Sequence, residues 1–519
     1  MYLTQPLHRA MQLRPDHTAT IYRDRRQTWK QLGERVARLA GGLRALDVRE
    51  GDRVAMLSLN SDRYLEYYFA VWWAGAVVVP MNIRWSVPEH VYSLNDSGAE
   101  IIVVDDMFKE AASAIQSQAA MVRHVIYAGD GATPEGMLNY ESLIRATSPI
   151  EDAFRNNEDL SGIFYTGGTT GFPKGVMLTH SSMWADAMST AHETEVYSDS
   201  CYLHAAPMFH LADGAGGFAA TIAGATHAMI PAFNPELVLN AIAQYGITHV
   251  VLVPTMIKLI LEHPAMAASD VSSLKRLLYG ASPIPETTLR DAIQKLPHCG
   301  LVQAYGQTEL SPVASILGPE YHVLDGPLST KLRSAGRATY VAEVKIVDPT
   351  GEEVPRGEVG EVAVRGPLTM QGYWNKPAET AKALVDGWVH TGDAAYMDDE
   401  GFIYIVDRIK DMIISGGENV YSVEVENALM KHMAVRDCVV IGVPDDTWGE
   451  RVHAIVIPKD GAVLSEQDLT QHCAALIATY KVPRSVEFRT EPFPVSGAGK
   501  VLKRELRKPY WEHETRQVH

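Results

Sequence analysis

The segment that most constrains this chain runs from Tyr165 to Val176 and reads YTGGTTGFPKGV. Its glycines let the backbone turn sharply and bring N–H groups close to an anion, its threonines add hydroxyl donors, and Lys174 adds a positive charge. These glycines and threonines are Gly167, Gly168, Gly171, Thr166, Thr169 and Thr170. Apolar residues flank the segment at 163–164 and 176–178. The sequence therefore predicts a phosphate-binding loop that joins two short strands.

This loop differs from the ordinary nucleotide P-loop. That motif has Gly immediately before its Lys and Ser or Thr after it, whereas Lys174 lies between Pro173 and Gly175. The flanking strands also differ from a P-loop, which leads into a helix. A surface loop rich in Gly and Thr, without a ligand, remains the alternative for this segment taken alone.

Composition indicates a globular protein of more than one domain. The chain has 519 residues, of which 46% are hydrophobic and 21% charged, so it can bury a large core. Its formal net charge of -17 argues against nonspecific binding to nucleic acid or anionic membranes, which depends on clustered Lys and Arg. The cysteines show no CxxC pair, so neither a zinc site nor a disulfide framework is expected. They are Cys201, Cys299, Cys438 and Cys473.

The apolar stretches predict a protein that is neither secreted nor membrane-spanning. The N-terminus MYLTQPLHRAMQ has no apolar signal region, and the run from Phe69 to Val79 is shorter than the roughly 18 residues that span a bilayer. A reducing cytoplasm is the expected location. The run should begin as a buried helix, pass through Gly75 and continue as a strand at 76–79.

The N-terminal part alternates strands with helices, which is the α/β pattern. Strands are expected at 54–57, 101–104, 122–127 and 249–253, and helices at 29–46 and 235–245. After Arg333 the short strands in VAEVKIVD, GEVGEVAVRG and GFIYIVD predict a β-rich subdomain that ends near Asp407. Beyond Lys410 an α+β module is expected, with helices at about 422–432 and from about 465, and strands at 438–443 and 452–457.

Seven segments together resemble the acyl- and aryl-CoA synthetases of the adenylate-forming superfamily, which also contains luciferases and nonribosomal-peptide adenylation domains. Besides the loop, they are PMFH at 207–210, YGASP at 279–283, YGQTE at 305–309, GWVHTGD ending at 393, DRIKDMIISGGEN at 407–419 and GAGK at 497–500. The resemblance covers nearly the whole chain. It implies an N-terminal domain at 1–409, made of two α/β subdomains and the β-rich subdomain, and a small mobile C-terminal domain at 410–519.

The resemblance also implies the reaction of an AMP-forming acid–thiol ligase. A carboxylate attacks the α-phosphate of ATP to give an acyl-adenylate and pyrophosphate, and coenzyme A then displaces AMP. Lys500 is expected to bridge the two anions in the first step. Glu309 is expected to hold Mg²⁺ on the phosphates, with Thr169 as a further ligand. On local grounds alone, a lysine at 500 is more often a surface charge, and Glu309 would equally start or cap a helix.

By the same resemblance, Asp393 should accept hydrogen bonds from both ribose hydroxyls, with Arg408 supporting the sugar. The small residues Gly280, Ala281 and Ser282 would leave room for adenine. The full nucleotide set is Thr166, Gly167, Gly168, Thr169, Thr170, Gly171, Lys174, Gly280, Ala281, Ser282, Tyr305, Gly306, Gln307, Thr308, Asp393 and Arg408. The alternatives are a turn aspartate at 393 and a plain loop at 280–282.

In this family the C-terminal domain rotates between the two half-reactions, and the residue that matches the hinge is Lys410. Ser415, Gly416 and Gly417 would then line the tunnel for pantetheine. Further residues expected near coenzyme A are Trp448, Lys481 and Arg484. For the last two, an ordinary surface charge is the alternative.

The acid itself is expected to bind beyond PMFH, with His210 as a gate beside the carboxylate. The predicted acyl pocket comprises Phe209, His210, Asp213, Gly280, Gly306 and Val313. The small residues of LADGAGGFAA favour a medium- or long-chain fatty acid or a bulky arylalkanoic acid, and a hydroxycinnamate or benzoate is the alternative. Gly214, Gly216 and Gly217 would otherwise serve close helix packing. Asp213 would meet a polar group on the substrate or cap the following helix.

Two rival functions belong to other classes. An amino-acid adenylation domain that loads a carrier protein usually has an acidic residue where this chain has His210, and no carrier module follows Lys500. An adenylate-binding sensor would not need Lys500. The expected partners are a carboxylic acid, ATP and coenzyme A. The oligomeric state stays open, with a homodimer as one candidate.

Overall fold

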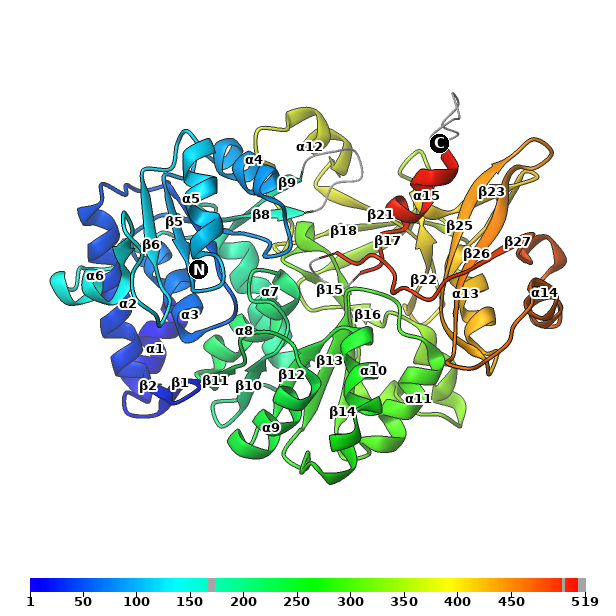
Figure 1. Ribbon diagram of the computed structural model, residues 1–519, viewed down its shortest axis with the longest axis horizontal. Coiled ribbons are helices and arrows are strands. Elements are labelled where there is room, and N and C mark those ends of the chain that lie inside the picture. The colour runs from blue at the N-terminus through cyan, green and yellow to red at the C-terminus, as the bar shows by residue number, and fades with distance from the viewer. Residues whose placement is uncertain (167–172, 497–499, 512–519) are drawn as a thin grey trace.

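The structure is a computed structural model that describes residues 1–166, 173–496 and 500–511. The described residues form four sheets, two in the α/β part, one in the β-rich part and one in the C-terminal part. Figure 1 shows them spread along the long axis, with the C-terminal sheet at one end. This arrangement confirms the predicted α/β class with two α/β subdomains, a β-rich subdomain and a small α+β domain.

The first sheet carries the flanks of the predicted phosphate loop. Its order is β19-β9-β8-β4-β3-β5-β6-β7, and β8 and β9 are antiparallel, with Phe164 opposite Val176. The two strands predicted around the loop are thus confirmed. The strand bounds are β3 (Arg53–Leu57), β4 (Val77–Pro80), β5 (Ile101–Val104), β6 (His124–Tyr127), β7 (Leu138–Asn139), β8 (Leu160–Thr166), β9 (Lys174–Thr179) and β19 (Gly372–Tyr373).

The longest apolar run folds as predicted, from a helix through a turn into a strand. Helix α3 (Asp62–Trp73) ends before Gly75, whose φ of 76° favours glycine, and β4 follows. Every residue of α3 is buried, because it lies in the core shared by the first two sheets. Its Tyr68 and Trp72 contact Phe218 of α8 (Leu211–Ala223), with ring centroids 5.4 and 5.6 Å apart.

The second sheet places the ends of its strands at the candidate site. Its order is β16-β15-β14-β13-β12-β10-β11-β1-β2, and the strands from β14 to β1 are parallel. The bounds are β1 (Thr18–Tyr22), β2 (Arg25–Thr28), β10 (Cys201–His204), β11 (Thr226–Met229), β12 (His249–Leu252), β13 (Arg276–Gly280), β14 (Gly300–Gly306), β15 (Val313–Leu317) and β16 (Arg337–Ala338). Ligands commonly bind at the carboxyl ends of such parallel strands.

The other two sheets confirm the β-rich subdomain and the C-terminal module. The third contains β17 (Glu343–Val347), β18 (Gly360–Arg365), β20 (Leu384–Val385), β21 (Trp388–Met397) and β22 (Ile403–Arg408). The fourth contains β23 (Ile413–Ser415), β24 (Glu418–Val420), β25 (Val435–Asp445), β26 (Gly449–Pro458) and β27 (Ser485–Phe488). A short 3-10 turn, Ile409–Asp411, links them. A domain boundary between 409 and 410 stays a prediction.

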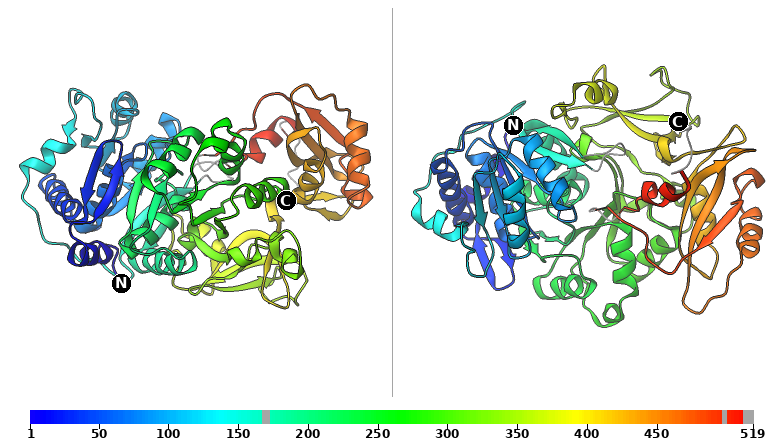
Figure 2. Two further views of the ribbon diagram at one scale, coloured as in Figure 1. Left: turned by 90° about the horizontal axis from the view of Figure 1, so that it is seen from below. Right: turned by 45° about the horizontal axis from the view of Figure 1, so that its top comes forward.

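Helices cover the sheets, as the two further views in Figure 2 show. The remaining ones are α1 (Gln5–Leu13), α2 (Trp29–Ala45), α4 (Val87–Ser97), α5 (Lys109–Gln118), α6 (Tyr140–Ala146), α7 (His180–Glu193), α9 (Pro235–Tyr245), α10 (Pro254–Glu262), α11 (Glu286–Lys295), α12 (Pro377–Ala383), α13 (Ser422–Met430), α14 (Glu466–Ala474) and α15 (Lys503–Trp511). Among the described residues, no helix is long and apolar enough to cross a membrane.

Candidate active site

The candidate site is centred on Asp393, a carboxylate buried to 5% exposure inside β21. Arg408 lies opposite it on β22, and its Nε is 2.6 Å from Asp393 Oδ1. Tyr305, near the end of β14, donates its hydroxyl to Asp393 Oδ2 at 2.8 Å. Asp393 therefore lies within a strand rather than in a turn, and both of its oxygens face the residues predicted to surround a nucleotide.

Glu309 is held by a residue that sequence reasoning did not single out. It lies in the short 3-10 turn Thr308–Leu310, whose N-cap is Gln307, and its Oε1 accepts the Tyr373 hydroxyl at 2.8 Å. Lys174 Nζ lies 4.7 Å from the centre of the Tyr373 ring. Tyr373 thus connects the predicted metal ligand to the predicted phosphate-binding lysine, and its hydrogen bond engages the Oε1 atom of Glu309.

Lys500 reaches this site from the C-terminal domain. The pKa of Lys500 is lowered to about 8, chiefly by burial and next by the charge of Arg408, while Asp393 and Glu309 act in the opposite direction. Its main-chain N–H donates to Ser496 Oγ at 3.1 Å. Arg84 of the N-terminal domain donates to the carbonyl of Ser496 at 2.8 Å. The described part of the lysine loop is therefore fixed on both sides, and Lys500 is not an isolated surface charge.

His210 borders the same space. It caps helix α8, because its Nδ1 accepts the N–H of Ala212 at 3.0 Å. Burial lowers the pKa of His210 to about 4, with a further contribution from Lys500. The imidazole is therefore neutral at pH 7, and since Nδ1 accepts, Nε2 carries the proton. His210 offers a hydrogen-bond donor, as a gate beside a carboxylate would.

The glycines at the ends of β13 and β14 are required by close backbone contacts. A Cβ on Gly280 would lie 2.1 Å from the carbonyl oxygen of Ala304, and one on Gly306 would lie 1.9 Å from that of Pro312. Ala281 has a φ of 66°, the left-handed region. With Ser282 these residues form the strand ends next to Tyr305, where adenine is predicted to bind.

The glycines of α8 do not leave open space for a substrate. A Cβ on Gly216 would lie 2.3 Å from the Tyr202 ring, and one on Gly217 would lie 2.8 Å from the His204 ring. One on Gly214 would be 3.2 Å from Leu211 and Phe218. The inference from these glycines to a roomy acyl pocket is wrong, because neighbouring side chains fill the volume they leave. Close packing, the alternative, is confirmed.

Asp213 belongs to a buried polar chain under α8. Its Oδ2 is 2.6 Å from Nδ1 of His204, and its Oδ1 accepts the Tyr202 hydroxyl at 3.2 Å. His204 Nε2 in turn is 2.9 Å from Nδ1 of His227, whose Nε2 is 3.2 Å from Thr221 Oγ1. Asp213 lies in the first turn of the helix, but the cap is His210, so the capping role expected for Asp213 is wrong.

The residues predicted to hold coenzyme A lie together at the C-terminal domain. The main-chain N–H of Gly416 donates to the Trp448 carbonyl at 2.8 Å, and the Arg484 guanidinium lies 4.0 Å from the centre of the Trp448 ring. Gly416 and Gly417 have φ values of 65° and 83°, which favour glycine. Ser415 ends β23, next to them. Lys481 instead pairs with Glu424 at 2.7 Å.

The structure therefore groups the predicted residues in two places. Asp393 contacts both Arg408 and Tyr305, and Lys500 lies close enough to Arg408, Asp393 and Glu309 for their charges to act on its pKa, whereas β23 belongs to the fourth sheet, between β24 and β26. Thr166 and Lys174 face each other at the base of the phosphate loop. Val313 lies in an apolar cluster with Tyr202, and Phe209 lies next to His210. The predicted Gly167, Gly168, Thr169, Thr170 and Gly171 lie outside the described residues, as do Gly497 and Gly499.

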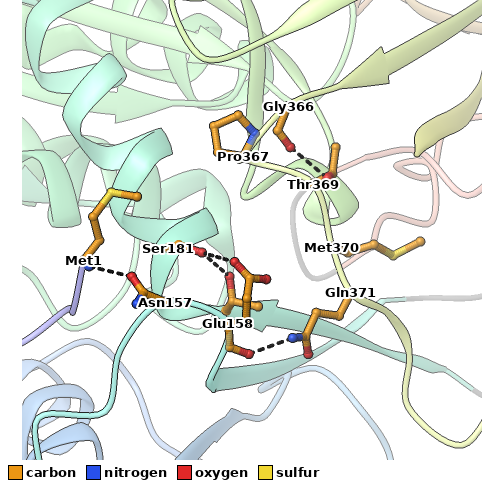
Figure 3. A pocket seen from close by; sticks show the side chains of 10 residues that line it. Met1, Asn157, Glu158, Ser181, Gly366, Pro367, Thr369, Met370 and Gln371 are labelled. Carbon is orange, nitrogen blue, oxygen red and sulfur yellow. Dashed lines mark hydrogen bonds between the residues drawn. The ribbon is translucent and has the colours of Figure 1, made fainter. Parts of the chain in front are cut away.

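A separate pocket of about 440 Å³ lies between the first sheet and the β-rich subdomain (Figure 3). Its wall includes Glu158 and Ser181, whose side chains are joined by a hydrogen bond, and Gln371, which donates to the Glu158 carbonyl. Among its described lining residues there is none of the predicted site residues. This pocket is therefore distinct from the candidate active site.

Comparison with known proteins identifies the family of this chain. Residues 7–374 match the family described as AMP-binding enzyme, and residues 424–500 match its C-terminal domain. A feruloyl-CoA synthase from an Amycolatopsis species is 41% identical over 97% of this chain and 98% of that protein. A fatty acid–[acyl-carrier-protein] ligase from Streptomyces coeruleorubidus is 36% identical over 97% of this chain and 95% of that protein.

Among solved structures, an anthranilate CoA ligase in complex with anthranoyl-AMP superposes with a TM-score of 0.91. It is 27% identical to this chain, and the match covers 98% of this chain and 97% of that one. The likeness therefore extends over both domains. The chain belongs to the AMP-binding enzyme family and is an adenylate-forming acid–CoA ligase.

Proposed function

We propose that this ligase activates an aryl acid of the hydroxycinnamate type with ATP and Mg²⁺ and then transfers the acyl group to coenzyme A. The observation that carries the proposal is the position of Lys500, which the C-terminal domain places beside Asp393, Arg408 and Glu309. An ammonium group at this point can lie between a carboxylate and an α-phosphate. It then offsets their repulsion as the new bond forms.

The surrounding residues divide the work of the first half-reaction. Asp393 accepts hydrogen bonds from the ribose, and Arg408 and Tyr305 fix its orientation. The Nε2–H group of His210 donates a hydrogen bond to the carboxylate of the acid. Glu309 would hold Mg²⁺, which supplies positive charge against the phosphates, and one carboxylate with phosphate oxygens is the usual ligand set for this ion. Tyr373 keeps Glu309 in place for that purpose.

The second half-reaction needs a different face of the C-terminal domain. Trp448 is 41% exposed, and the Nη1 atom of Arg484 is buried with no hydrogen-bond partner among the described residues. An aromatic face and a guanidinium suit the adenine and phosphates of coenzyme A. Lys481 is the weaker candidate, because Glu424 already pairs with it. Since the described contacts of Trp448 and Arg484 do not include the group around Asp393, we infer that the domain turns about Lys410 to bring them to the adenylate.

The choice of an aryl acid rests on the space under α8. Tyr202 fills the volume beside Gly216 and lies in one apolar cluster with Val251, Leu278 and Val313. We infer that Tyr202 closes the inner end of the predicted acyl pocket and so limits the length of chain that fits. A flat aryl acid needs less depth than a long alkyl chain. The similarity to a feruloyl-CoA synthase supports the same class.

We therefore expect acid-dependent pyrophosphate release with hydroxycinnamic acids to exceed that with long-chain fatty acids. Tyr202→Ala should shift the ratio of kcat/KM values toward longer acids, because it opens the inner end. Tyr202→Phe is the matched control, since it keeps the ring and loses only the bond to Asp213. A wild-type preference for long fatty acids, or an unchanged ratio in a folded Tyr202→Ala variant, would contradict the aryl assignment. Thioester formation with free coenzyme A, compared with a carrier protein, identifies the acceptor.

A second expectation concerns pH. Adenylation requires the charged form of Lys500, and burial lowers the pKa of this group to about 8 in the free enzyme. The kcat/KM for pyrophosphate release should therefore fall as the pH rises through about 8, whereas an ordinary lysine keeps its charge to above about 10. In Lys500→Arg the alkaline fall should disappear at a lower overall rate, because a guanidinium stays charged. A wild-type profile that is flat to high pH would contradict the charge role.

A further inference from the structure

The last two residues of β22 contact different parts of the molecule. Asp407 and Arg408 are neighbours on this strand, so their side chains point to opposite faces of the sheet. Arg408 is directed to Asp393 in the candidate site, at 2.6 Å. Asp407 is directed to the C-terminal domain, and β22 is itself held to β21 by its strand pairing. Asp407 therefore belongs to the N-terminal side of the predicted hinge, but its contacts lie on the other side.

The partner of Asp407 is the N-terminus of α13. Asp407 Oδ2 accepts the main-chain N–H of Ser422 at 2.5 Å and the Ser422 hydroxyl at 2.7 Å. The N-cap residue Tyr421 provides no side-chain cap, so Asp407 supplies one from another domain. A carboxylate is well placed there because the helix dipole is positive at its N-terminus. Asp407 is only 4% exposed, and Ser422 is fully buried.

The contact extends to the segment that carries Lys500. Lys503 donates its ammonium to Ser422 Oγ at 2.5 Å and pairs with Glu426 at 2.7 Å. Glu426 Oε1 also accepts the N–H of Val440, so this end of the chain is anchored in the C-terminal sheet. Lys503 begins α15, three positions after Lys500. A continuous path of hydrogen bonds thus joins the nucleotide-binding strand to the base of the catalytic loop.

We propose that Asp407 is a positioning residue that holds Lys500 in the adenylating position through Ser422 and Lys503, and that this contact breaks when the domain turns. The inference rests on the two-orientation mechanism of the proposed function. Asp407 precedes Lys410, whereas Ser422 and Lys503 follow it. A rotation about Lys410 therefore separates them, because Asp407 stays with the β21–β22 ladder.

The charge of Asp407 explains why its contact with Ser422 and Lys503 favours the adenylating orientation. Burial raises the pKa of Asp407 above its ordinary value, and Lys503 and the Ser422 bonds offset part of that rise. The carboxylate is thus stable in this buried position only with its partners from the other domain. The charged group that faces it is Lys503, which also pairs with Glu426, and its own neighbour Arg408 contributes a main-chain N–H to Asp407 Oδ1. Once the partners have moved away, only the Arg408 N–H of these groups stays with Asp407.

Two separate assays test the proposal. Asp407→Asn should reduce acid-dependent ATP–pyrophosphate exchange by about 10- to 100-fold, the cost of one or more charged hydrogen bonds. Thioester formation from a supplied acyl-adenylate and coenzyme A should be unchanged or faster. Ser422→Ala should have a smaller effect of the same kind. In a double-mutant cycle the two changes should be coupled in the exchange rate and additive in the thioester rate.

Asp398→Asn is the matched control. Asp398 lies in the β21–β22 hairpin, accepts the N–H groups of Glu400 and Phe402, and pairs with Lys331 at 2.7 Å, all within one domain. Its replacement should alter both half-reactions equally or not at all. Equal loss of both half-reactions in Asp407→Asn, or no change in either with an active wild type, would overturn the positioning role. A wild type without acid-dependent exchange would instead count against the proposed function.

Discussion

Replacing Lys500 with alanine is expected to reduce acyl-adenylate formation by at least about 10²- to 10³-fold, the usual cost of removing one preorganised donor from a developing anion. The same variant should convert supplied acyl-adenylate and coenzyme A into thioester at nearly the wild-type rate, because the lysine is withdrawn in that step. Pyrophosphate release measures the first half-reaction, and thioester formed from synthetic adenylate measures the second.

Lys503→Ala provides a useful comparison for this result. Lys503 lies on the same segment, and among the described residues its ammonium contacts Ser422 and Glu426. Its replacement should lower adenylation less than Lys500→Ala does. If Lys500→Ala lost both half-reactions to the same extent while remaining folded, Lys500 would not be specific to the adenylating state.

Lys410→Pro is expected to give the opposite pattern. Lys410 is the second residue of the 3-10 turn Ile409–Asp411, and the φ of about −50 to −70° in such a turn matches the φ of about −65° that proline imposes. The substitution should therefore be compatible with the orientation seen here and should hinder any orientation that needs another φ. Adenylate should form normally and accumulate, whereas thioester synthesis should slow by orders of magnitude.

Lys410→Ala separates the side chain from the backbone. It removes the ammonium group but leaves φ free, so thioester synthesis should continue. Arg507 donates to the Lys410 carbonyl, a contact that both variants retain. Unimpaired thioester synthesis in Lys410→Pro would show that the turn is not the pivot.

Much of the architecture could be predicted because it depends on patterns of residues that are close together in the sequence. The apolar run with Gly75 gave a helix, a turn and a strand, and the Gly- and Thr-rich segment between apolar residues gave the β8–β9 pair. These patterns involve residues near in sequence. The convergence of Lys500 on Asp393 could be expected only by resemblance, because the two residues are far apart in the chain.

The acyl pocket shows where sequence reasoning fails. A glycine on a helix indicates that another group approaches the helix backbone closely. It does not indicate whether that group is a ligand or a neighbouring side chain. In α8 the neighbours are Tyr202 and His204, which come from β10 on the second sheet. Their size decides against a large empty pocket, and no pattern within LADGAGGFAA contains that information.

Tyr373 and Asp407 were missed for a related reason. Tyr373 stands in the short strand β19, and its role follows only from its contacts with Glu309 and Lys174. The sequence predicts only that the β-rich subdomain ends near Asp407, yet its carboxylate is bound by Ser422 across the predicted hinge. Both contacts depend on how separate elements pack, so only the folded chain reveals them.

The central claim, that one C-terminal domain serves two half-reactions in turn, is tested most directly by a distance between the domains. Spin labels can be attached to cysteines introduced at the exposed Leu13 and Val463, since all four native cysteines are buried. With ATP, an unreactive acid analogue and Mg²⁺ we expect one distance, and with acyl-adenylate and an unreactive coenzyme A analogue a clearly different one. In Lys410→Pro the first distance should persist under both conditions. A single unchanged distance in the wild type under both conditions would contradict the account.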